Sequence, residues 1–184
     1  MAWNVIRVLY ENYDMDKREA EDLLDFVAMA TVCDVMSLTG ENRILVKEGL
    51  KRIRHTKNIG LQALMQACNV QPENISAYHF GYVLGPCVNA TGRLDTARHA
   101  LRLFETGQET EAEEIARDLV DLNQERKELT LQGVEMAKKL CEEGGYENDP
   151  VLVLFLPDVH ESIAGLIAGR IPVSYTHLTL PTKR

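Results

Sequence analysis

The segment Gly85–Ala97 concentrates residue types that bind anions. Asn89, Arg93 and Asp95 follow a Gly-Pro pair within it. Gly and Pro interrupt regular backbone, so we predict that Asn89 and Arg93 project from an irregular turn between buried elements. A guanidinium binds phosphate or carboxylate through two parallel hydrogen bonds, which makes Arg93 a candidate anion ligand. A helix-capping turn, with Asp95 as N-cap and Arg93 as a surface cation, explains the same spacing.

A single carboxylate, Asp34, stands in a run of mostly apolar residues. The run 25–43 has apolar residues on every side of Asp34 and is predicted to form a buried helix or strand. A buried carboxylate loses its hydration, so it needs a metal ion, a cation or several N–H donors beside it. Asp34 is therefore either a metal ligand or the cap of a neighbouring turn, and one aspartate does not decide between them.

Four segments together resemble one known family. They fall in order along the chain, at residues 30–43, 85–97, 122–126 and 160–170. In sequence and order they are similar to the motifs of the RecJ single-strand-specific DNA exonucleases, members of the DHH phosphoesterase superfamily. The resemblance extends from the first residues to about Ile171.

This resemblance implies a metal-dependent, single-strand-specific 5′-to-3′ exonuclease that acts in DNA repair and recombination. It implies that Asp34 is the last protein ligand of a site for two Mn²⁺ or Mg²⁺ ions, which activate water and stabilise the leaving oxygen. It also implies that Asn89 and Arg93 hold the phosphate of the terminal nucleotide, and that Gln124 contacts a sugar or base near the site.

His160 and Arg170 are implied to face the same cleft from a second domain. The chain departs from the family there: Gly169 replaces a usual Ser, and Glu161–Ser162 follows His160 where the family commonly has Gly. The family's Asp-His-His triplet and other early metal ligands have no counterpart in this sequence. We therefore expect an incomplete metal site, in a fragment that is inactive alone.

Two other functions remain open at this stage. One is a phosphoesterase of the same superfamily that acts on oligonucleotides or cyclic dinucleotides, and the other is a non-enzymatic helical interaction module. Single-stranded DNA is the expected partner, with a single-strand-binding protein and a helicase as possible further ones. The aromatic residues Tyr78, Phe80 and Tyr82 could stack on bases, although core packing explains their alternation at least as well.

The composition predicts a cytoplasmic protein with one good core. The chain has 184 residues, 45% of them hydrophobic, with four scattered cysteines and no apolar stretch long enough for a membrane. Its net charge of −8 is unusual for a DNA-binding protein. The acid gathers in 14–25 and 105–143, while a basic cluster occupies 47–57. That cluster could follow a DNA backbone, but a solvated amphipathic helix face explains it better.

We expect a mainly α fold with a small α/β portion, as a fragment of a two-domain DHH-type phosphoesterase whose domains are joined by a long helix. Apolar periodicity predicts helices at 4–13, 16–35, 41–55, 60–68, 95–107, 109–143 and 162–171, and a buried strand at 151–156. In the long helix we expect Ile115, Leu119 and Leu122 to be buried against the helix of Leu101 and Phe104. Its segment Lys127–Gln132 should be more exposed.

The resemblance also predicts domain boundaries. Residues 1–57 would end the DHH catalytic domain, 58–108 would carry the substrate-binding turn, 109–145 would connect, and 146–171 would begin the DHH-associated domain. Residues 172–184 have no family counterpart and look like the translation of a sequencing adapter, so no native element is expected there. An edge strand formed by this Thr-rich stretch is the less favoured alternative.

Overall fold

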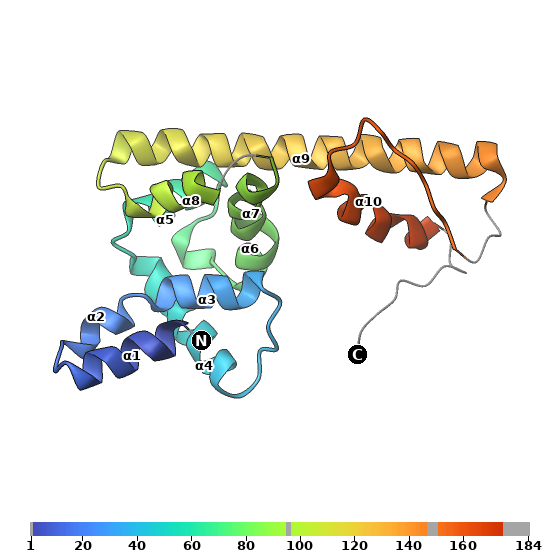
Figure 1. The fold of residues 1–184 in the computed structure, drawn as a ribbon. Helices are drawn as coiled ribbons and strands as arrows, with labels where there is room; N and C mark the ends of the chain where they lie inside the picture. The colour runs from blue at the N-terminus through green and yellow to red at the C-terminus, as the bar shows by residue number, and fades with distance from the viewer. Residues whose placement is uncertain (1, 95–96, 147–150, 175–184) are drawn as a thin grey trace. The chain divides into compact units, whose positions relative to one another are not determined.

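The structure, a computed structural model, describes residues 2–94, 97–146 and 151–174. It divides into two compact units, Met1–Val120 and Asp121–Arg184, which are described separately below. The described residues are mainly helical, and none of them forms a β-strand. Figure 1 shows the helices in chain order. The expected mainly α fold is confirmed.

The first unit is built from short helices and the first turns of a long one. Its elements are α1 (Ala2–Asn12), α2 (Lys17–Glu21), α3 (Leu24–Cys33), α4 (Gly40–Arg52), the 3₁₀ turns η1 (Ile53–His55) and η2 (Pro72–Asn74), α5 (Ile59–Ala67), α6 (Ala77–His79), the π-helix η3 (Phe80–Leu84), α7 (Gly85–Leu94), α8 (Ala97–Glu105) and the start of α9 (Glu109–Gly144). The Trp3 indole N–H donates to the Ala20 carbonyl at 2.7 Å and ties α1 to α2.

The core of this unit gathers side chains from most of its helices. The largest fully buried members are Ile53, Leu61, Leu64, Phe80, Leu84, Leu103 and Leu119. These residues come from α5, η3, α8 and α9 among other elements. The core is therefore shared, and each helix buries its apolar face against its neighbours. Helices α3 and α4 pack closely along their length, and Gly49 of α4 lies directly on Leu24 and Ala28 of α3.

The second unit pairs the C-terminal part of α9 with α10 (Glu161–Ser174). Its core is small and aliphatic: Val134, Ala137, Ile163, Ile167 and Ile171. Gly133 lets the two helices approach, since a β-carbon there would lie 3.1 Å from Cγ1 of Ile167. A glycine that looks like a helix interruption in sequence is here a packing position.

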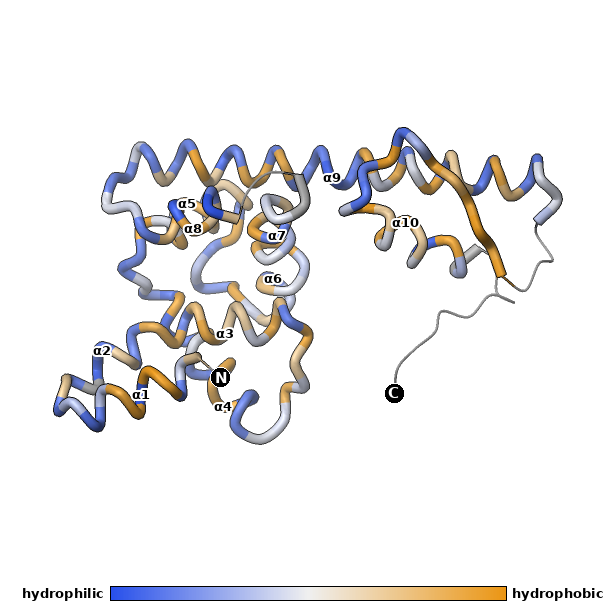
Figure 2. Tube along the Cα trace, in the orientation of Figure 1, coloured by the Kyte–Doolittle hydropathy of each residue, from blue (hydrophilic) through white to orange (hydrophobic). Residues whose placement is uncertain are grey.

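The predicted long helix is confirmed as one continuous element of 36 residues. Figure 2 shows hydrophobic and hydrophilic residues alternating along it. Ile115 and Leu119 are buried in the core that also holds Leu103, whereas Leu122 is only half-buried. The expected packing against α8 is made through Leu103 and Phe104, whereas Leu101 of that helix is 53% exposed. Most of 127–132 is exposed as predicted, except for the buried Thr130.

The predicted strand Val151–Leu156 is wrong, because that stretch has no ladder partner among the described residues. The alternation of apolar side chains along this stretch does correspond to alternating burial. Leu152, Leu154 and Leu156 pack against the core of the second unit, while Val153 and Phe155 are more than four-fifths exposed. Extended backbone that packs one side on a helix pair gives the same alternation as a strand.

Two other local predictions need correction. The helix expected at 16–35 is divided into α2 and α3 by a turn at Asp22 and Leu23. The irregular turn expected at 85–97 is helical through Leu94. No helix in the part of the chain that the structure describes is long and apolar enough to cross a membrane. Of the predicted adapter-derived tail, residues 172–174 continue α10, and residues 175–184 lie outside the described residues.

Candidate functional site

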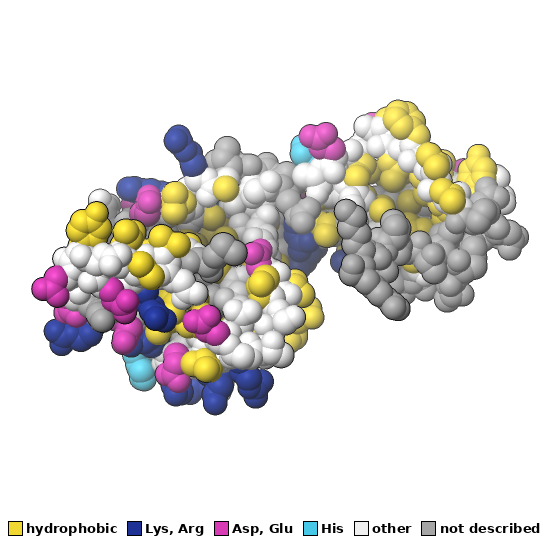
Figure 3. All heavy atoms as spheres, turned by 60° about the horizontal axis from the view of Figure 1, so that its bottom comes forward, with side chains coloured by type: hydrophobic (Ala, Val, Ile, Leu, Met, Phe, Trp, Pro, Cys, Tyr) yellow, Lys and Arg dark blue, Asp and Glu magenta, His cyan; other side chains and the backbone are white. Residues whose placement is uncertain are grey.

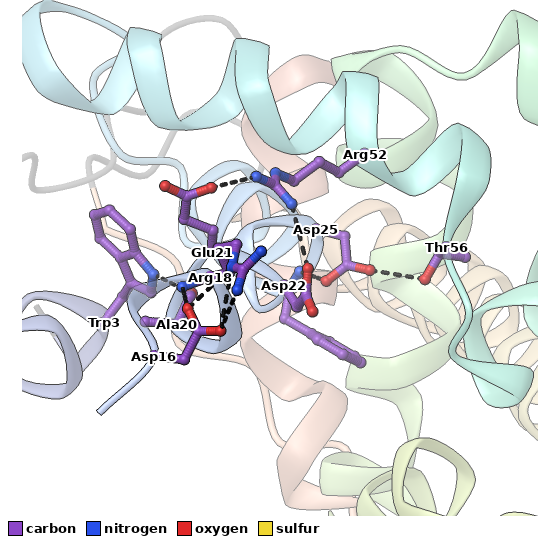
Figure 4. A network of polar contacts seen from close by, with 10 residues as sticks. Trp3, Asp16, Arg18, Ala20, Glu21, Asp22, Asp25, Arg52 and Thr56 are labelled. Atoms are coloured by element: carbon purple, nitrogen blue, oxygen red, sulfur yellow. Dashed lines mark hydrogen bonds and ion pairs between the residues drawn. The ribbon is translucent and has the colours of Figure 1, made fainter. Parts of the chain in front are cut away.

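Asp34 is exposed, which corrects the prediction that it is buried. It caps the C-terminus of α3, where its N–H donates to the Ala30 carbonyl at 2.9 Å. The buried carboxylate of this region is Asp25, 4% exposed. Asp25 accepts a hydrogen bond from the Thr56 hydroxyl at 2.8 Å (Figure 4). The Phe26 N–H donates to the same carboxylate at 2.7 Å. Asp25 is thus the structural aspartate, and Asp34 is open to a ligand.

The backbone directly after Asp34 is strained. Val35 has φ +53°, a left-handed conformation that is unfavourable for a β-branched side chain. The Val35 N–H donates to Val32 and the Met36 N–H to Thr31, which together close α3 with a Schellman motif. Such motifs usually place glycine at this position. Strain of this kind clusters at functional sites, which favours a functional role for the Asp34 turn.

Asn89 lies on α7 and is exposed, and Arg93 follows one turn later on the same helix. The side chain of Arg93 lies outside the described residues. Pro86 does not break the helix because it stands where the hydrogen bonding changes from the π-helix η3 to α7. A residue without an N–H is tolerated at that junction. The Asn-Ala-Thr-Gly-Arg sequence is therefore displayed by a helix and not by a loop.

The structure brings the Asp34 turn and the α7 segment into contact. The Cys33 thiol donates to the Phe80 carbonyl at 3.4 Å, and the same carbonyl accepts the Gly85 N–H across the π-helical turn. Gly85 packs directly against Cys33, since a β-carbon there would lie 3.6 Å from the Cys33 Cβ and overlap its sulfur. Two motifs that are 51 residues apart, as counted from Asp34 to Gly85, therefore meet at their ends.

Burial raises the pKa of the Cys33 thiol, and the neighbouring negative charge of Asp34 raises it further. The neutral thiol is the form that can donate to the Phe80 carbonyl. The same chemistry makes Cys33 a poor nucleophile, because thiolate is the reactive form. We therefore assign Cys33 to packing between α3 and η3.

The other predicted site residues belong to the second unit. The Gln124 amide donates to Glu128 at 2.7 Å along α9, and both side chains are exposed. His160 precedes α10, where its Nδ1 lies 2.7 Å from the Ser162 hydroxyl and accepts the Ser162 N–H at 3.3 Å. It therefore caps the helix. Arg170 is exposed ten residues further on, so α10 does not bring it close to His160.

A complete metal centre is not present in the described part of the chain. Those residues contain no group of three or more His, Cys, Asp or Glu side chains placed to hold an ion. Asp34 is an exposed carboxylate. One such ligand does not hold two divalent ions, which each need several oxygen ligands. The residues seen here therefore do not fit a two-metal site by themselves.

The basic cluster 47–57 is partly neutralised within the first unit. Arg52 donates to Glu21 at 2.6 Å and to Asp22 at 3.3 Å, which joins α4 to α2 (Figure 4). Lys51 pairs with Glu48 at 2.7 Å. Acidic, basic and apolar side chains share the face drawn in Figure 3. Part of this basic cluster is therefore engaged in ion pairs on a solvated helix surface.

Tyr78 and Tyr82 are exposed, whereas core packing of the alternating aromatic residues would have buried them. They are 62% and 74% exposed, and their rings stack on each other with centroids 5.1 Å apart. Phe80, between them in sequence, is fully buried. The apolar pattern could not distinguish these outcomes, because aromatic residues serve both in cores and on binding surfaces.

Comparison with known proteins identifies the relatives of this chain. No family model matches it. The single-stranded-DNA-specific exonuclease RecJ of Escherichia coli is 38% identical over 155 residues, which are 82% of this chain and 27% of that protein. The crystal structure of RecJ from Thermus thermophilus in complex with Mn²⁺ matches with a TM-score of 0.81 and 31% identity, over 95% of this chain and 26% of that one.

The same protein solved in complex with Mg²⁺ gives a TM-score of 0.82 at 31% identity, over 95% of this chain and 27% of that one. This chain thus spans about a quarter of the length of the relatives it matches. The predicted resemblance is confirmed in both sequence and fold. The chain is related to the RecJ single-stranded-DNA-specific exonucleases and corresponds to one segment of them.

Proposed function

We propose that this chain is the strand-holding segment of a RecJ-type exonuclease, which degrades single-stranded DNA from its 5′ end with Mn²⁺ or Mg²⁺. The observation that carries this proposal is the junction of α3 with η3 and α7. It sets the Asp34 turn against the helix of Asn89 and Arg93. The relatives named above act on single-stranded DNA or were solved with these ions.

Each residue of the first unit has a distinct task in this proposal. Asp34 contributes one carboxylate to a metal site whose other ligands come from parts of the RecJ-type protein that this chain does not match. Asn89 and Arg93 hold a phosphate through amide and guanidinium donors, which stabilise an anion without proton transfer. The bound ions would supply the Lewis acid and the activated water.

The residues of the second unit contribute binding. Gln124 presents an amide for a sugar or base, and His160 and Arg170 present further donors to the strand. The hydrogen bond from Gln124 to Glu128 would have to exchange when DNA binds. We propose the segments 1–57, 58–108, 109–145 and 146–171 as the end of the catalytic domain, the substrate-binding segment, the connector and the start of the second domain.

The acidic composition is compatible with this proposal. Binding at a metal site needs positive charge locally, and the net charge of the whole chain has less influence. We propose a cytoplasmic protein that works on strands opened by a helicase and covered by a single-strand-binding protein. These two partners follow from the substrate, because free single strands in a cell arise by unwinding and are coated.

A segment exchange tests the proposed function. The 155 matching residues of the E. coli relative would be replaced by the corresponding residues of this chain, and 5′-labelled single strands would be incubated with Mn²⁺. We expect the chimera to degrade single strands and spare duplexes. A folded chimera without single-strand degradation would overturn the proposal.

Three controls accompany the exchange. Asp34→Asn in the chimera should remove metal-dependent cleavage while leaving the melting temperature unchanged, because Asp34 is exposed and caps through its backbone. Glu114→Gln, a change at an exposed position of α9, should preserve cleavage. The isolated chain should release no nucleotide above buffer, since it holds one metal ligand. If the isolated chain did release nucleotide in the presence of metal, and Asp34→Ala abolished that release, its metal site would be complete.

A further inference from the structure

We infer that the stacked rings of Tyr78 and Tyr82 form a platform on which bases of the single strand stack before its phosphate reaches Asn89. This inference rests on the proposed function, because it assigns the base-binding surface of the same strand-holding segment. Aromatic platforms bind single strands through the faces of the bases, and they do so with little sequence preference.

The first observation is the exposure and geometry of the pair. Tyr78 and Tyr82 leave most of their surface in solvent, and their ring planes lie 25° from parallel. Among the described residues, no hydrogen bond engages either hydroxyl. Large exposed rings without a polar partner present an apolar face to water, which a nucleobase would cover.

The second observation is that the platform is held in place before any ligand arrives. The His79 ring meets Tyr78 edge-on at 5.7 Å. His79 is itself fixed by Ser76, whose N–H donates to the His79 Nδ1 at 3.2 Å in a capping box. Phe80 anchors the helix in the core with no exposed surface. A preorganised surface loses less side-chain entropy on binding, which favours affinity.

The third observation is the position of Asn89 along the helical stretch that carries the two tyrosines. The elements α6, η3 and α7 follow one another without a break from Ala77 to Leu94. Asn89 comes seven residues after Tyr82 on this helical stretch, ~10 Å along its axis, and both side chains are exposed. One strand can therefore touch the rings and the Asn89 amide together.

The fourth observation is charge. The sequence has no Asp or Glu from Asn74 to Leu94, although the chain carries 28 acidic residues. A polyanion would meet no like charge from these residues, unlike the glutamate-rich surface of α9. This favours nucleic acid over an apolar protein surface as the occupant.

The test measures binding of a fluorescent single-stranded oligonucleotide to this chain and to its variants. A matched abasic oligonucleotide keeps the phosphates and lacks the bases. We expect the wild type to prefer the base-containing strand. Tyr78→Ala with Tyr82→Ala should weaken its binding by roughly 5- to 150-fold, the effect of ~1–3 kcal/mol per stacked base. Binding of the abasic strand should not change.

Tyr78→Phe with Tyr82→Phe is the conservative control, and it should retain the preference because the ring faces remain. Equal loss of both strands in the alanine variant would overturn the platform, as would a wild type that shows no preference or no binding. An alanine variant that melts earlier in the chimera but not in the isolated chain would assign the rings to a protein interface and also overturn it.

This inference and the proposed function fail in different ways. If the chimera lacks exonuclease activity while the chain still binds bases through the tyrosines, the proposed function alone is wrong. If the chimera degrades single strands and the alanine variant binds them as tightly as the wild type, only the platform is wrong. In the chimera, the platform variant should raise KM for single strands far more than it lowers kcat, because the rings bind substrate away from the reacting phosphate.

Discussion

Gly60 of α5 lies directly against the backbone of Leu103 in α8. A β-carbon on Gly60 would stand 2.7 Å from the Leu103 carbonyl carbon and would overlap its oxygen. Helix α5 therefore packs on α8 through bare backbone, beside the buried Leu103 side chain. This contact, and not local conformation, explains a glycine inside a helix that would otherwise favour alanine.

Gly60→Ala should destabilise the chain by about 1–3 kcal/mol, because the backbone of α8 must move to admit the methyl group. Urea denaturation followed by far-UV circular dichroism measures the change. Gly92→Ala is the matched control, since Gly92 is also helical and a β-carbon there would meet nothing within 4 Å. That control should be neutral or gain up to about 1 kcal/mol. Equal behaviour of the two variants would contradict the close packing.

Val35→Asn should stabilise the chain by about 1 kcal/mol. Val35 is 89% exposed, so the change loses little packing, and asparagine tolerates the left-handed backbone better than valine. The reverse exchange offers a mirror control. Asn69 closes α5 with the same motif at φ +55°, and Asn69→Val should lose a similar amount. Thermal melting of both variants tests this prediction. Melting temperatures that shift in the same direction would show that the left-handed backbone at Val35 is not a source of strain.

Thr56→Val should cost about 1–3 kcal/mol, because it removes the hydroxyl that donates to the buried Asp25 carboxylate. The double variant Asp25→Asn with Thr56→Val distinguishes this cause from lost packing. If the carboxylate is the source, the two changes will couple and not add. Additive losses in denaturant titrations would show that the hydrogen bond contributes little.

Glu111 should make the stability of the first unit depend on pH. The hydrogen bond from Arg102, then that from Thr106, lowers the pKa of Glu111 below its usual value. Its contribution is therefore fully present above the unfolded-state pKa of about 4.3 and is lost as pH falls through the lower folded pKa. Glu111→Gln should be less stable than wild type at neutral pH, and the difference should close in acid.

Denaturation midpoints measured from neutral to acidic pH test this expectation. Glu114→Gln is the control, since Glu114 is exposed on the same part of α9. Its curve should follow that of the wild type at every pH. A Glu111→Gln difference that persists unchanged in strong acid would show that packing, and not the carboxylate, stabilises this turn.

Local sequence patterns predicted most of the helices of this protein and identified its family. The apolar repeat of α9 predicted a continuous helix, because three- and four-residue steps place side chains on one face wherever the helix lies. The four motifs likewise identified RecJ, since residue identity and order are properties of the chain alone. The segment that carries Asn89 and Arg93 was predicted as a turn and is a helix. Pro86 normally indicates a helix break, and the sequence pattern did not reveal the π-helical turn that precedes it here.

Only the tertiary structure decided which side chains face water. Asp25 and Asp34 stand in the same apolar run, yet Thr56 from a distant segment covers the first and nothing described covers the second. Tyr82 and Phe80 are two residues apart with opposite exposure. Burial depends on which helices pack where, and such contacts between distant residues leave no local periodicity to read.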